Sequence, residues 1–328
     1  MRVRCLLWIS IALIGLAGCN TRAQNRENPP RRMLYVVPEA LPTNYSWQVL
    51  GHRATDLVWV GARIVNNGNL RGAGTAIAAM EKHGQHIVQV PVPTAAMEIH
   101  SYAPARHHLL IGLADVETGI QILSNPDKRK RSQGALAKLL QQTPTLTGLQ
   151  LDFEYLPAKY AAAFTDYIRT LRAALPAEKT LHVAVFPPVG MPEAWHAFHN
   201  LPKLATVSDG IVVMLYDYHR QGTAPGCISG MVWLQQNVQV LQELPRSKIW
   251  LGAPLYGYHF AGKRTSALGK SRFEKRKGNR SEADGCYQVQ SAAGKTYYPS
   301  HALYHEYDRL VREKGFAGVA YWRAGFER

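Results

Sequence analysis

Residues 147–155 read TGLQLDFEY, a stretch in which polar and apolar side chains alternate. The two-residue period of a β-strand puts Gln150, Asp152 and Glu154 on one face and the apolar residues on the other. Burying two carboxylates this close together is costly unless they share a proton, and sharing keeps one carboxylic acid protonated near neutral pH. An edge strand with a solvated acidic face is the alternative, but the apolar runs on both sides disfavour it. We therefore predict a buried strand that presents a general acid.

Apolar runs rich in β-branched residues recur from residue 33 onward, and helical patterns separate several of them. This alternation indicates parallel strands that are buried on both faces and connected by helices. There are nine candidate strands, one more than a (β/α)8 barrel requires, and the surplus lies before residue 115. A doubly wound open sheet is the alternative, although no Gly-rich phosphate loop follows the first strand. The candidates are residues 33–37, 57–64, 86–92, 109–113, 149–155, 181–186, 210–216, 249–256 and 318–322.

Four segments resemble the motifs of family 18 glycoside hydrolases, the chitinase-like enzymes. Residues 147–155 resemble the DxxDxDxE signature, in the form found in cell-wall and spore-cortex members. Residues 214–219 (MLYDYH) resemble the MxYD motif of the sixth strand, and residues 250–257 (WLGAPLYG) resemble the seventh-strand LGxPLYG. Residues 318–322 (GVAYW) resemble the eighth strand, which carries a Trp at the barrel floor. The resemblance runs from about residue 120 to the C-terminus and implies a (β/α)8 TIM barrel.

The resemblance also implies a retaining glycoside hydrolase that cleaves β-linked N-acetylglucosamine glycans without a cofactor. In this family the counterpart of Glu154 protonates the glycosidic oxygen, and the substrate's own 2-acetamido group attacks the anomeric carbon to form an oxazolinium ion. Asp152 would orient that group, and Tyr216 would hydrogen-bond its oxygen. The substrate-binding set is Gln150, Asp217, Trp322 and, because it ends a strand at the catalytic face, Tyr256.

The chain departs from the family pattern at two places. Thr147 and Gln150 stand where the signature has its first two Asp residues, and Gln150 can hydrogen-bond Asp152 but cannot share a proton with it. A shifted pH optimum follows as an expectation. The third-strand SxGG motif is matched only partly, by residues 110–115 (LIGLAD).

Two other functions remain open. One is a catalytically inactive, chitinase-like glycan-binding lipoprotein, but the presence of Glu154, Asp152 and Tyr216 favours an enzyme. The other keeps the enzyme and changes the substrate to an N-glycan core or an exopolysaccharide.

The N-terminus reads as an export signal. Arg2 and Arg4 precede an apolar run over residues 5–18, which is too short to span a bilayer comfortably. Residues 16–19 (LAGC) resemble the lipobox of bacterial lipoproteins, so we predict a signal peptide over residues 1–18 and lipidation of Cys19; an ordinary signal peptide is the alternative. Residues 19–32 would form a flexible tether, and residues 33–328 a single catalytic domain. Asn20 favours anchoring to the outer membrane, on its periplasmic face.

The charge balance favours anionic partners. The chain has 38 Lys and Arg against 23 Asp and Glu, a net charge of +15, and its 46% hydrophobic residues exclude a disordered chain. Export removes nucleic acid from the partners, which leaves the membrane, through the lipid anchor, and an anionic glycan such as peptidoglycan. We expect peptidoglycan rather than chitin, and a monomer.

The cysteines and the basic residues point to one further region. No cysteine or histidine spacing indicates a metal site, and Cys227 and Cys286 are expected to form a disulfide in an oxidising compartment. Residues 258–300, between the seventh and eighth strands, form an insert that should lie on the active-site face. This insert would grip an anionic glycan or, alternatively, be a solvated loop. Its basic residues include Lys270, Arg272, Lys275, Arg276, Lys277 and Arg280.

Overall fold

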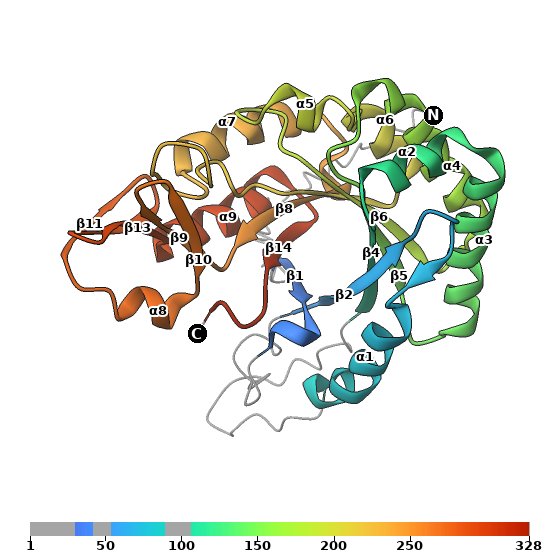
Figure 1. The fold of residues 1–328 in the computed structure, drawn as a ribbon, viewed down its shortest axis with the longest axis horizontal. Coiled ribbons are helices and arrows are strands. Elements are labelled where there is room, and N and C mark those ends of the chain that lie inside the picture. Colours follow the sequence, from blue (N-terminus) through green and yellow to red (C-terminus); the bar gives the residue numbers. More distant parts are fainter. Residues whose placement is uncertain (1–29, 42–53, 89–105, 328) are drawn as a thin grey trace, which may run out of the picture.

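A computed structural model describes residues 30–41, 54–88 and 106–327 (Figure 1). Cys19 and the predicted signal segment lie outside the described residues. Eight parallel strands form a closed barrel, because the first strand pairs with the second as well as with the last. The predicted (β/α)8 barrel is confirmed. Its strands are β1 (Arg31–Val36), β2 (Asp56–Ile64), β4 (Arg106–Leu113), β5 (Gly148–Asp152), β6 (Thr180–Val185), β7 (Gly210–Val213), β8 (Ile249–Pro254) and β14 (Gly318–Trp322).

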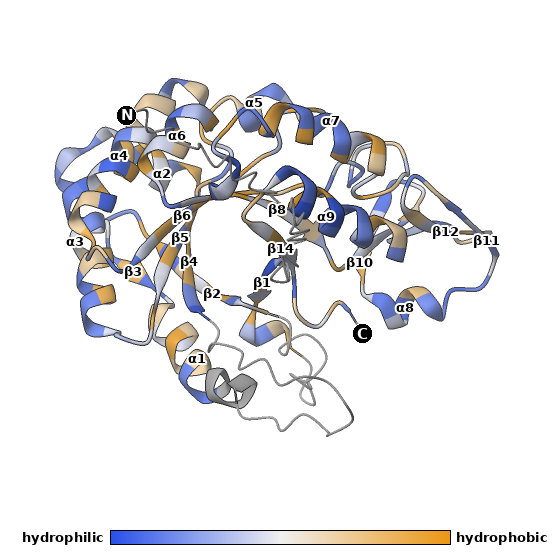
Figure 2. Cartoon of the chain, turned by 180° about the vertical axis from the view of Figure 1, so that it is seen from behind, coloured by the Kyte–Doolittle hydropathy of each residue, from blue (hydrophilic) through white to orange (hydrophobic). Residues whose placement is uncertain are grey.

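Helices surround the barrel and carry apolar stripes that face it (Figure 2). In the helix over residues 161–174, Phe164, Ile168 and Leu171 are fully buried against the sheet. The last helix stops at Gly315, whose left-handed backbone (φ 73°) terminates helices without a side-chain clash. No helix in the described ranges is long and apolar enough to cross a membrane. The helices are α1 (Ala73–Val88), α2 (Val116–Ser124), α3 (Pro126–Gln142), α4 (Ala161–Ala174), α5 (Glu193–His196), α6 (Leu201–Val207), α7 (Met231–Leu241) and α9 (His301–Lys314), with 3₁₀ turns at Pro38–Ala40, Ala158–Tyr160 and Arg246–Lys248.

The barrel strands are buried on both faces, as their apolar sequences predict. In β1, Leu34 and Val36 pack outward into the large core between sheet and helices. Met33 and Tyr35 alternate with them and pack inside the barrel. The same alternation holds in β5, where Leu149 and Leu151 point outward. The remaining face of each strand therefore points into the barrel and toward its mouth.

One predicted strand is wrong. Residues 86–88 of the candidate 86–92 belong to α1, and residues 89–92 lie outside the described residues. A short apolar run is compatible with a buried helix as well as with a strand, so its pattern alone does not distinguish them. Three other strands end two or three residues earlier than predicted: β5 at Asp152, β7 at Val213 and β8 at Pro254. The chemically interesting residues after them therefore lie in loops at the mouth.

The insert after β8 is a small antiparallel sheet beside the barrel (Figure 1). Its five strands follow the order β10-β9-β13-β12-β11. The loop after β7 contacts this sheet, because the side chain of Gln221 donates to Lys263 O and accepts from Thr265 N. The insert thus adjoins the mouth of the barrel. Its elements are β9 (Gly257–Ala261), β10 (Arg264–Leu268), α8 (Lys270–Glu274), β11 (Asn279–Ala283), β12 (Cys286–Ser291) and β13 (Gly294–Pro299).

Candidate active site

Asp152 and Glu154 lie together at the carboxyl end of β5, close enough for each carboxyl group to shift the pKa of the other. Burial, followed by the charge of Asp152, raises the pKa of Glu154 to about 9. Burial raises the pKa of Asp152 to about 6. Both shifts favour retention of a proton by the pair near neutral pH. General acid catalysis requires such a retained proton.

Gln150 lies one layer deeper in the barrel and is fully buried. Its Nε2 donates to the hydroxyl of Tyr35 on β1, and not to Asp152, which is a partner that the sequence allowed. The difference has a simple cause. Residues two apart on a strand are about 7 Å apart, while Tyr35 projects across the barrel toward Gln150. Among the described residues, Asp152 Oδ1 and Gln150 Oε1 are buried without a hydrogen-bond partner. A buried unpaired acceptor is costly, so Asp152 Oδ1 is positioned to accept from a ligand.

Asp217 forms the second acidic centre of the mouth, in the loop after β7. Its Oδ1 accepts hydrogen bonds from the phenols of Tyr256 (2.6 Å) and Tyr258 (2.8 Å). Burial raises the pKa of Asp217, and the two phenol hydrogen bonds oppose that shift. The charge of Asp217 in turn raises the pKa of Glu154, so the two acidic centres interact electrostatically.

Tyr216 and Trp322 complete the predicted set. Burial raises the pKa of Tyr216 well above its usual value, and nearby Asp152, Asp217 and Glu154 raise it further. Tyr216 therefore keeps its proton and can act as a hydrogen-bond donor. Trp322 ends β14, and its ring lies 5.2 Å from that of Tyr35 inside the barrel. The structure thus brings all seven predicted catalytic and substrate-binding residues to one end of the barrel.

Two backbone conformations at this mouth are uncommon. Tyr155 and Asp217 both have left-handed backbones, with φ of 59° and 62°. Such conformations are unfavourable for residues other than Gly and concentrate at functional sites. Each follows directly on a residue of the predicted set, Glu154 or Tyr216. The turns aim neighbouring side chains into the mouth instead of continuing the strands.

Sequence reasoning missed several residues of this site. Tyr35 contacts Gln150 across 115 positions of sequence, and Tyr258 contacts Asp217 across 41, so no local pattern reports either contact. Tyr155 is 47% exposed, and its pKa is raised by burial and by the charge of Glu154. Its position directly after the acid was the one available signal. The exposed ring also packs edge-on against Trp195, which places an aromatic surface beside the acid.

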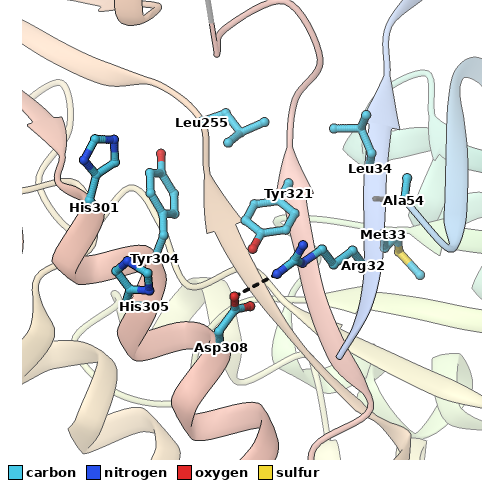
Figure 3. Close-up of a pocket in the computed structure, with 10 residues that line it drawn as sticks. All are labelled: Arg32, Met33, Leu34, Ala54, Leu255, His301, Tyr304, His305, Asp308 and Tyr321. Atoms are coloured by element: carbon cyan, nitrogen blue, oxygen red, sulfur yellow. Dashed lines mark hydrogen bonds and ion pairs between the residues drawn. The ribbon is translucent and has the colours of Figure 1, made fainter. Parts of the chain in front are cut away.

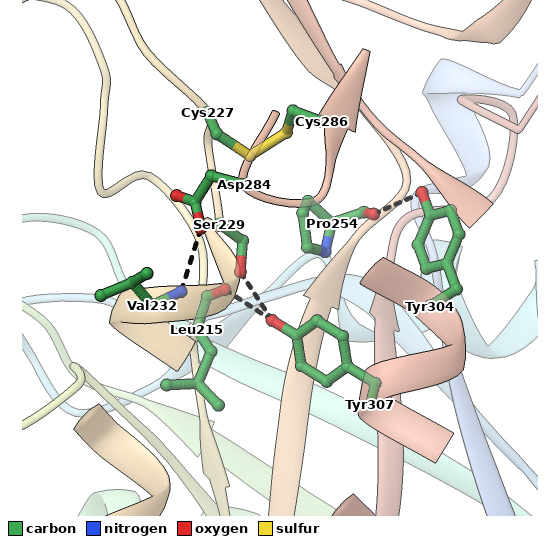
Figure 4. Close-up of a disulfide and its surroundings, with 9 residues drawn as sticks. All are labelled: Leu215, Cys227, Ser229, Val232, Pro254, Asp284, Cys286, Tyr304 and Tyr307. Carbon is green, nitrogen blue, oxygen red and sulfur yellow. Dashed lines mark hydrogen bonds between the residues drawn. A yellow bond between two sulfur atoms is a disulfide. The ribbon is translucent and has the colours of Figure 1, made fainter. Parts of the chain in front are cut away.

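The predicted pair Cys227 and Cys286 forms a disulfide in the structure (Figure 4). It links the loop after β7 to β12 of the insert. The neighbouring Asp284 reinforces the link, because its Oδ1 accepts from the backbone N–H of Val232 in the first turn of α7. Tyr307 of α9 donates to the carbonyl of Leu215, immediately before Tyr216. These contacts hold the loop that carries Tyr216 and Asp217.

A separate cavity of about 300 Å³ lies on the outer side of the barrel, between α9 and strands β1 and β14 (Figure 3). An ion pair between Arg32 and Asp308 (2.8 Å) forms part of its wall. None of the carboxylates at the mouth lines it. This cavity is therefore distinct from the candidate active site. In the described ranges, no group of three or more His, Cys, Asp or Glu side chains is arranged to hold a metal ion.

Comparisons with known proteins agree with this geometry. The Bacillus subtilis (strain 168) protein YdhD is 29% identical over 140 residues, which are 42% of this chain and 33% of YdhD. The spore cortex-lytic enzyme SleL of Bacillus cereus superposes with a TM-score of 0.76 at 16% identity, covering 90% of this chain and 71% of SleL. A Cycas revoluta GH18 chitinase, solved in complex with (GlcNAc)3, gives 0.73 at 15% identity, covering 90% of this chain and 96% of the chitinase. This chain thus spans about a third of the length of YdhD, and the two structures show the fold. The model of the glycosyl hydrolases family 18 matches residues 107–327, about two thirds of the sequence, and the chain therefore belongs to that family.

Proposed function

We propose that this protein is a retaining glycosidase that cleaves β-linked N-acetylglucosamine glycans by substrate-assisted catalysis. The observation that carries the proposal is the buried carboxyl pair at the end of β5, where burial and the charge of Asp152 raise the pKa of Glu154. A single protonated acid beside a carboxylate meets the requirements of a mechanism in which the enzyme supplies no nucleophile of its own.

In the first step, Glu154 transfers its proton to the glycosidic oxygen. The carbonyl oxygen of the substrate's 2-acetamido group attacks the anomeric carbon from the opposite face, and the bond to the leaving sugar breaks. Asp152 accepts a hydrogen bond from the acetamido N–H and stabilises the positive charge of the oxazolinium ion. Tyr216, which keeps its proton, donates to the acetamido oxygen.

In the second step, Glu154 is the general base. It takes a proton from a water molecule, whose oxygen attacks the anomeric carbon and opens the oxazolinium ring. Two inversions leave the configuration retained. Trp322 supports the apolar face of the sugar from below, and Asp217 holds the aromatic side of the mouth through Tyr256 and Tyr258.

The proposed substrate is peptidoglycan rather than chitin. Between residues 258 and 300 the insert has nine Lys and Arg but three Asp and Glu, and it adjoins the mouth. A positively charged surface beside a glycan cleft favours an anionic polymer over a neutral one. SleL, with which the fold superposes, is named a spore cortex-lytic enzyme. Lipidation at Cys19 and an outer-membrane location would keep the enzyme beside such a polymer, and they form part of the proposal.

The test is release of reducing ends from purified peptidoglycan and from chitooligosaccharides. The full-length chain is compared with Glu154→Gln and with a control, Glu178→Gln, at an exposed position. We expect the first substitution to abolish cleavage, by about 100-fold or more, and the control to have no effect. No turnover of either glycan, with equal binding by all three proteins, would instead indicate the inactive glycan-binding lipoprotein.

A further inference from the structure

A pair of arginines lies at the rim of the barrel next to β2. After a bulge between Val60 and Ala62, β2 continues and pairs with the short antiparallel strand β3 (Leu70–Arg71). In this ladder Arg63 is directly opposite Arg71. Both side chains are exposed, and neither has a carboxylate partner among the described residues. Like charges directly across a ladder are destabilising unless an anion neutralises them.

The register of the barrel places this pair on the catalytic face. Arg63 pairs with Gly112 of β4, and Gly112 pairs with Asp152 of β5. The outward residues Ala62 and Ile64 flank Arg63 in the outer core, so Arg63 belongs to the inward face, as Asp152 does. Two strand spacings separate their backbones, about 10 Å. Arg63 is therefore level with Asp152.

Gly112 lies between the two residues in this register. Among the described residues, a Cβ atom added there would meet only the carbonyl oxygen of Asp152, at 3.9 Å. A cavity of about 410 Å³ is lined by both arginines. Gly72, which also lines it, directly precedes α1, so the positive end of a 16-residue helix adjoins the same cavity. The cavity thus combines two guanidinium groups with a helix N-terminus.

We propose that Arg63 and Arg71 form an anionic subsite that binds a carboxylate on a sugar next to the one held at Asp152. This inference rests on the proposed function and deepens it. A guanidinium binds a carboxylate through two parallel hydrogen bonds, a geometry that the ammonium group of a lysine cannot provide. The carboxylate is that of the lactyl group on the glycan strand. Where a peptide is joined to the lactyl group through an amide bond, it is a carboxylate of that peptide. A chitin chain has neither group, so the arginines discriminate between the two glycans.

The first experiment measures kcat/KM of the full-length protein on chitotetraose and on peptide-free peptidoglycan strands. Arg63→Gln, Arg71→Gln and the double variant are compared with Arg246→Gln, an exposed arginine at the opposite end of the barrel. Each rim substitution should lower kcat/KM on the carboxylated strands about 10- to 100-fold, chiefly by raising KM. Turnover of chitotetraose should stay within about twofold. Equal losses on both substrates, or no loss on the carboxylated one, would overturn the subsite.

The second experiment measures binding and does not need turnover. Calorimetry compares peptide-free strands with the same strands after their carboxyl groups have been converted to amides, and with strands that still bear peptides. Wild-type protein should bind the carboxylated strands at least about 10-fold more tightly than the amidated ones, and Arg63→Gln should remove that difference. A preference seen only with peptide-bearing strands would assign the carboxylate to the peptide. Equal affinity for all three kinds of strand would reject the subsite, whereas carboxylate-dependent binding without turnover would reject only the proposed catalysis.

Discussion

Burial is the main reason why Glu154 keeps its proton, and the charge of Asp152 is the second. The unfolded chain lacks both effects, so its glutamic acid titrates near the ordinary value of 4.5. Between that pH and about 9 the folded protein holds a proton that the unfolded chain has released. The contribution of Glu154 to stability is therefore fully present below the unfolded pKa and is lost as the pH rises through the folded one.

Replacing Glu154 with Gln removes this titration. We expect the free energy of unfolding of Glu154→Gln to exceed that of the wild type by about 1–3 kcal/mol at pH 8, and the difference to shrink toward pH 5. Urea unfolding at pH 5, 6.5 and 8 measures it, with Glu178→Gln as the control that should follow the wild type. If the free energy of unfolding changed with pH equally in the wild type and in Glu154→Gln, the pKa of Glu154 would not be raised in the folded protein.

At the scale of elements, the insert that adjoins the mouth of the barrel also contributes a side chain to the site. Tyr258 on β9 donates one of the two phenol hydrogen bonds that Asp217 accepts, and both bonds lower the pKa of Asp217. We expect Tyr258→Phe to raise that pKa further, so that the acidic limb of the pH profile of kcat/KM moves to higher pH. Activity should fall about 10-fold.

Carbon-13 NMR of labelled aspartate reports the Asp217 titration directly. The matched control is Tyr287→Phe, because Tyr287 lies in the same insert sheet, on β12, and does not contact Asp217. An unchanged Asp217 titration in Tyr258→Phe would mean that the hydrogen bond at 2.8 Å contributes nothing to the charge of that site.

The disulfide and Asp284 connect the insert to the barrel at one place. The disulfide closes a loop of 59 residues, and such a cross-link typically contributes about 2–4 kcal/mol by restricting the unfolded chain. Exchanging both Cys227 and Cys286 for Ser should lower the free energy of unfolding by that amount. Amide hydrogen exchange should accelerate in β11–β13 and leave β5 protected. Equal acceleration in β5 would show that the insert and the barrel unfold as one unit.

At the scale of the whole molecule, the alternation of apolar runs with helical patterns predicted parallel strands joined by helices, and the four family motifs predicted the barrel. The residues at which the strands end could not be predicted, since intrinsic strand propensity does not determine them. Residues 149–155 alternate throughout, yet β5 stops at Asp152 and Tyr155 takes a left-handed conformation. Glu154 follows the end of β5, in a loop, where the sequence predicted that it lies within the strand.

Contacts between distant strands of the barrel could not be predicted from the sequence either. Tyr35 and Arg63 lie on strands that precede the recognisable motifs, and only the three-dimensional register places them level with β5. The apolar run 86–92 shows the opposite limit, because a local pattern fits a helix as well as a strand. Local patterns therefore predicted most of the barrel strands and placed Glu154 at the end of β5, whereas the other walls of the site depend on long-range pairing.

The amino end of the barrel contains a buried ionic cluster that joins its closing seam. Asp56, at the start of β2, is fully buried. Its carboxylate accepts from Arg106 (2.9 Å) and contacts His108 (3.1 Å), both on β4. Arg31 on β1 lies 3.3 Å away. One carboxylate thus links three adjacent strands, including the pair β1 and β2 that closes the barrel.

Removing that carboxylate leaves buried donors without an acceptor. We expect Asp56→Ala to lower the free energy of unfolding by about 2–4 kcal/mol, less than for a fully enclosed ion pair because both arginines are about 40% exposed and can turn to water. Asp127→Ala, an exposed aspartate in the first turn of α3, should change it by less than about 1 kcal/mol. Urea unfolding measures the stability of both variants. The kcat of Asp56→Ala, measured at urea concentrations well below its unfolding transition, should equal that of the wild type, because the cluster lies at the end of the barrel opposite Glu154. A loss of kcat without a loss of stability would mean that the two ends of the barrel are coupled, and it would contradict a purely structural role for Asp56.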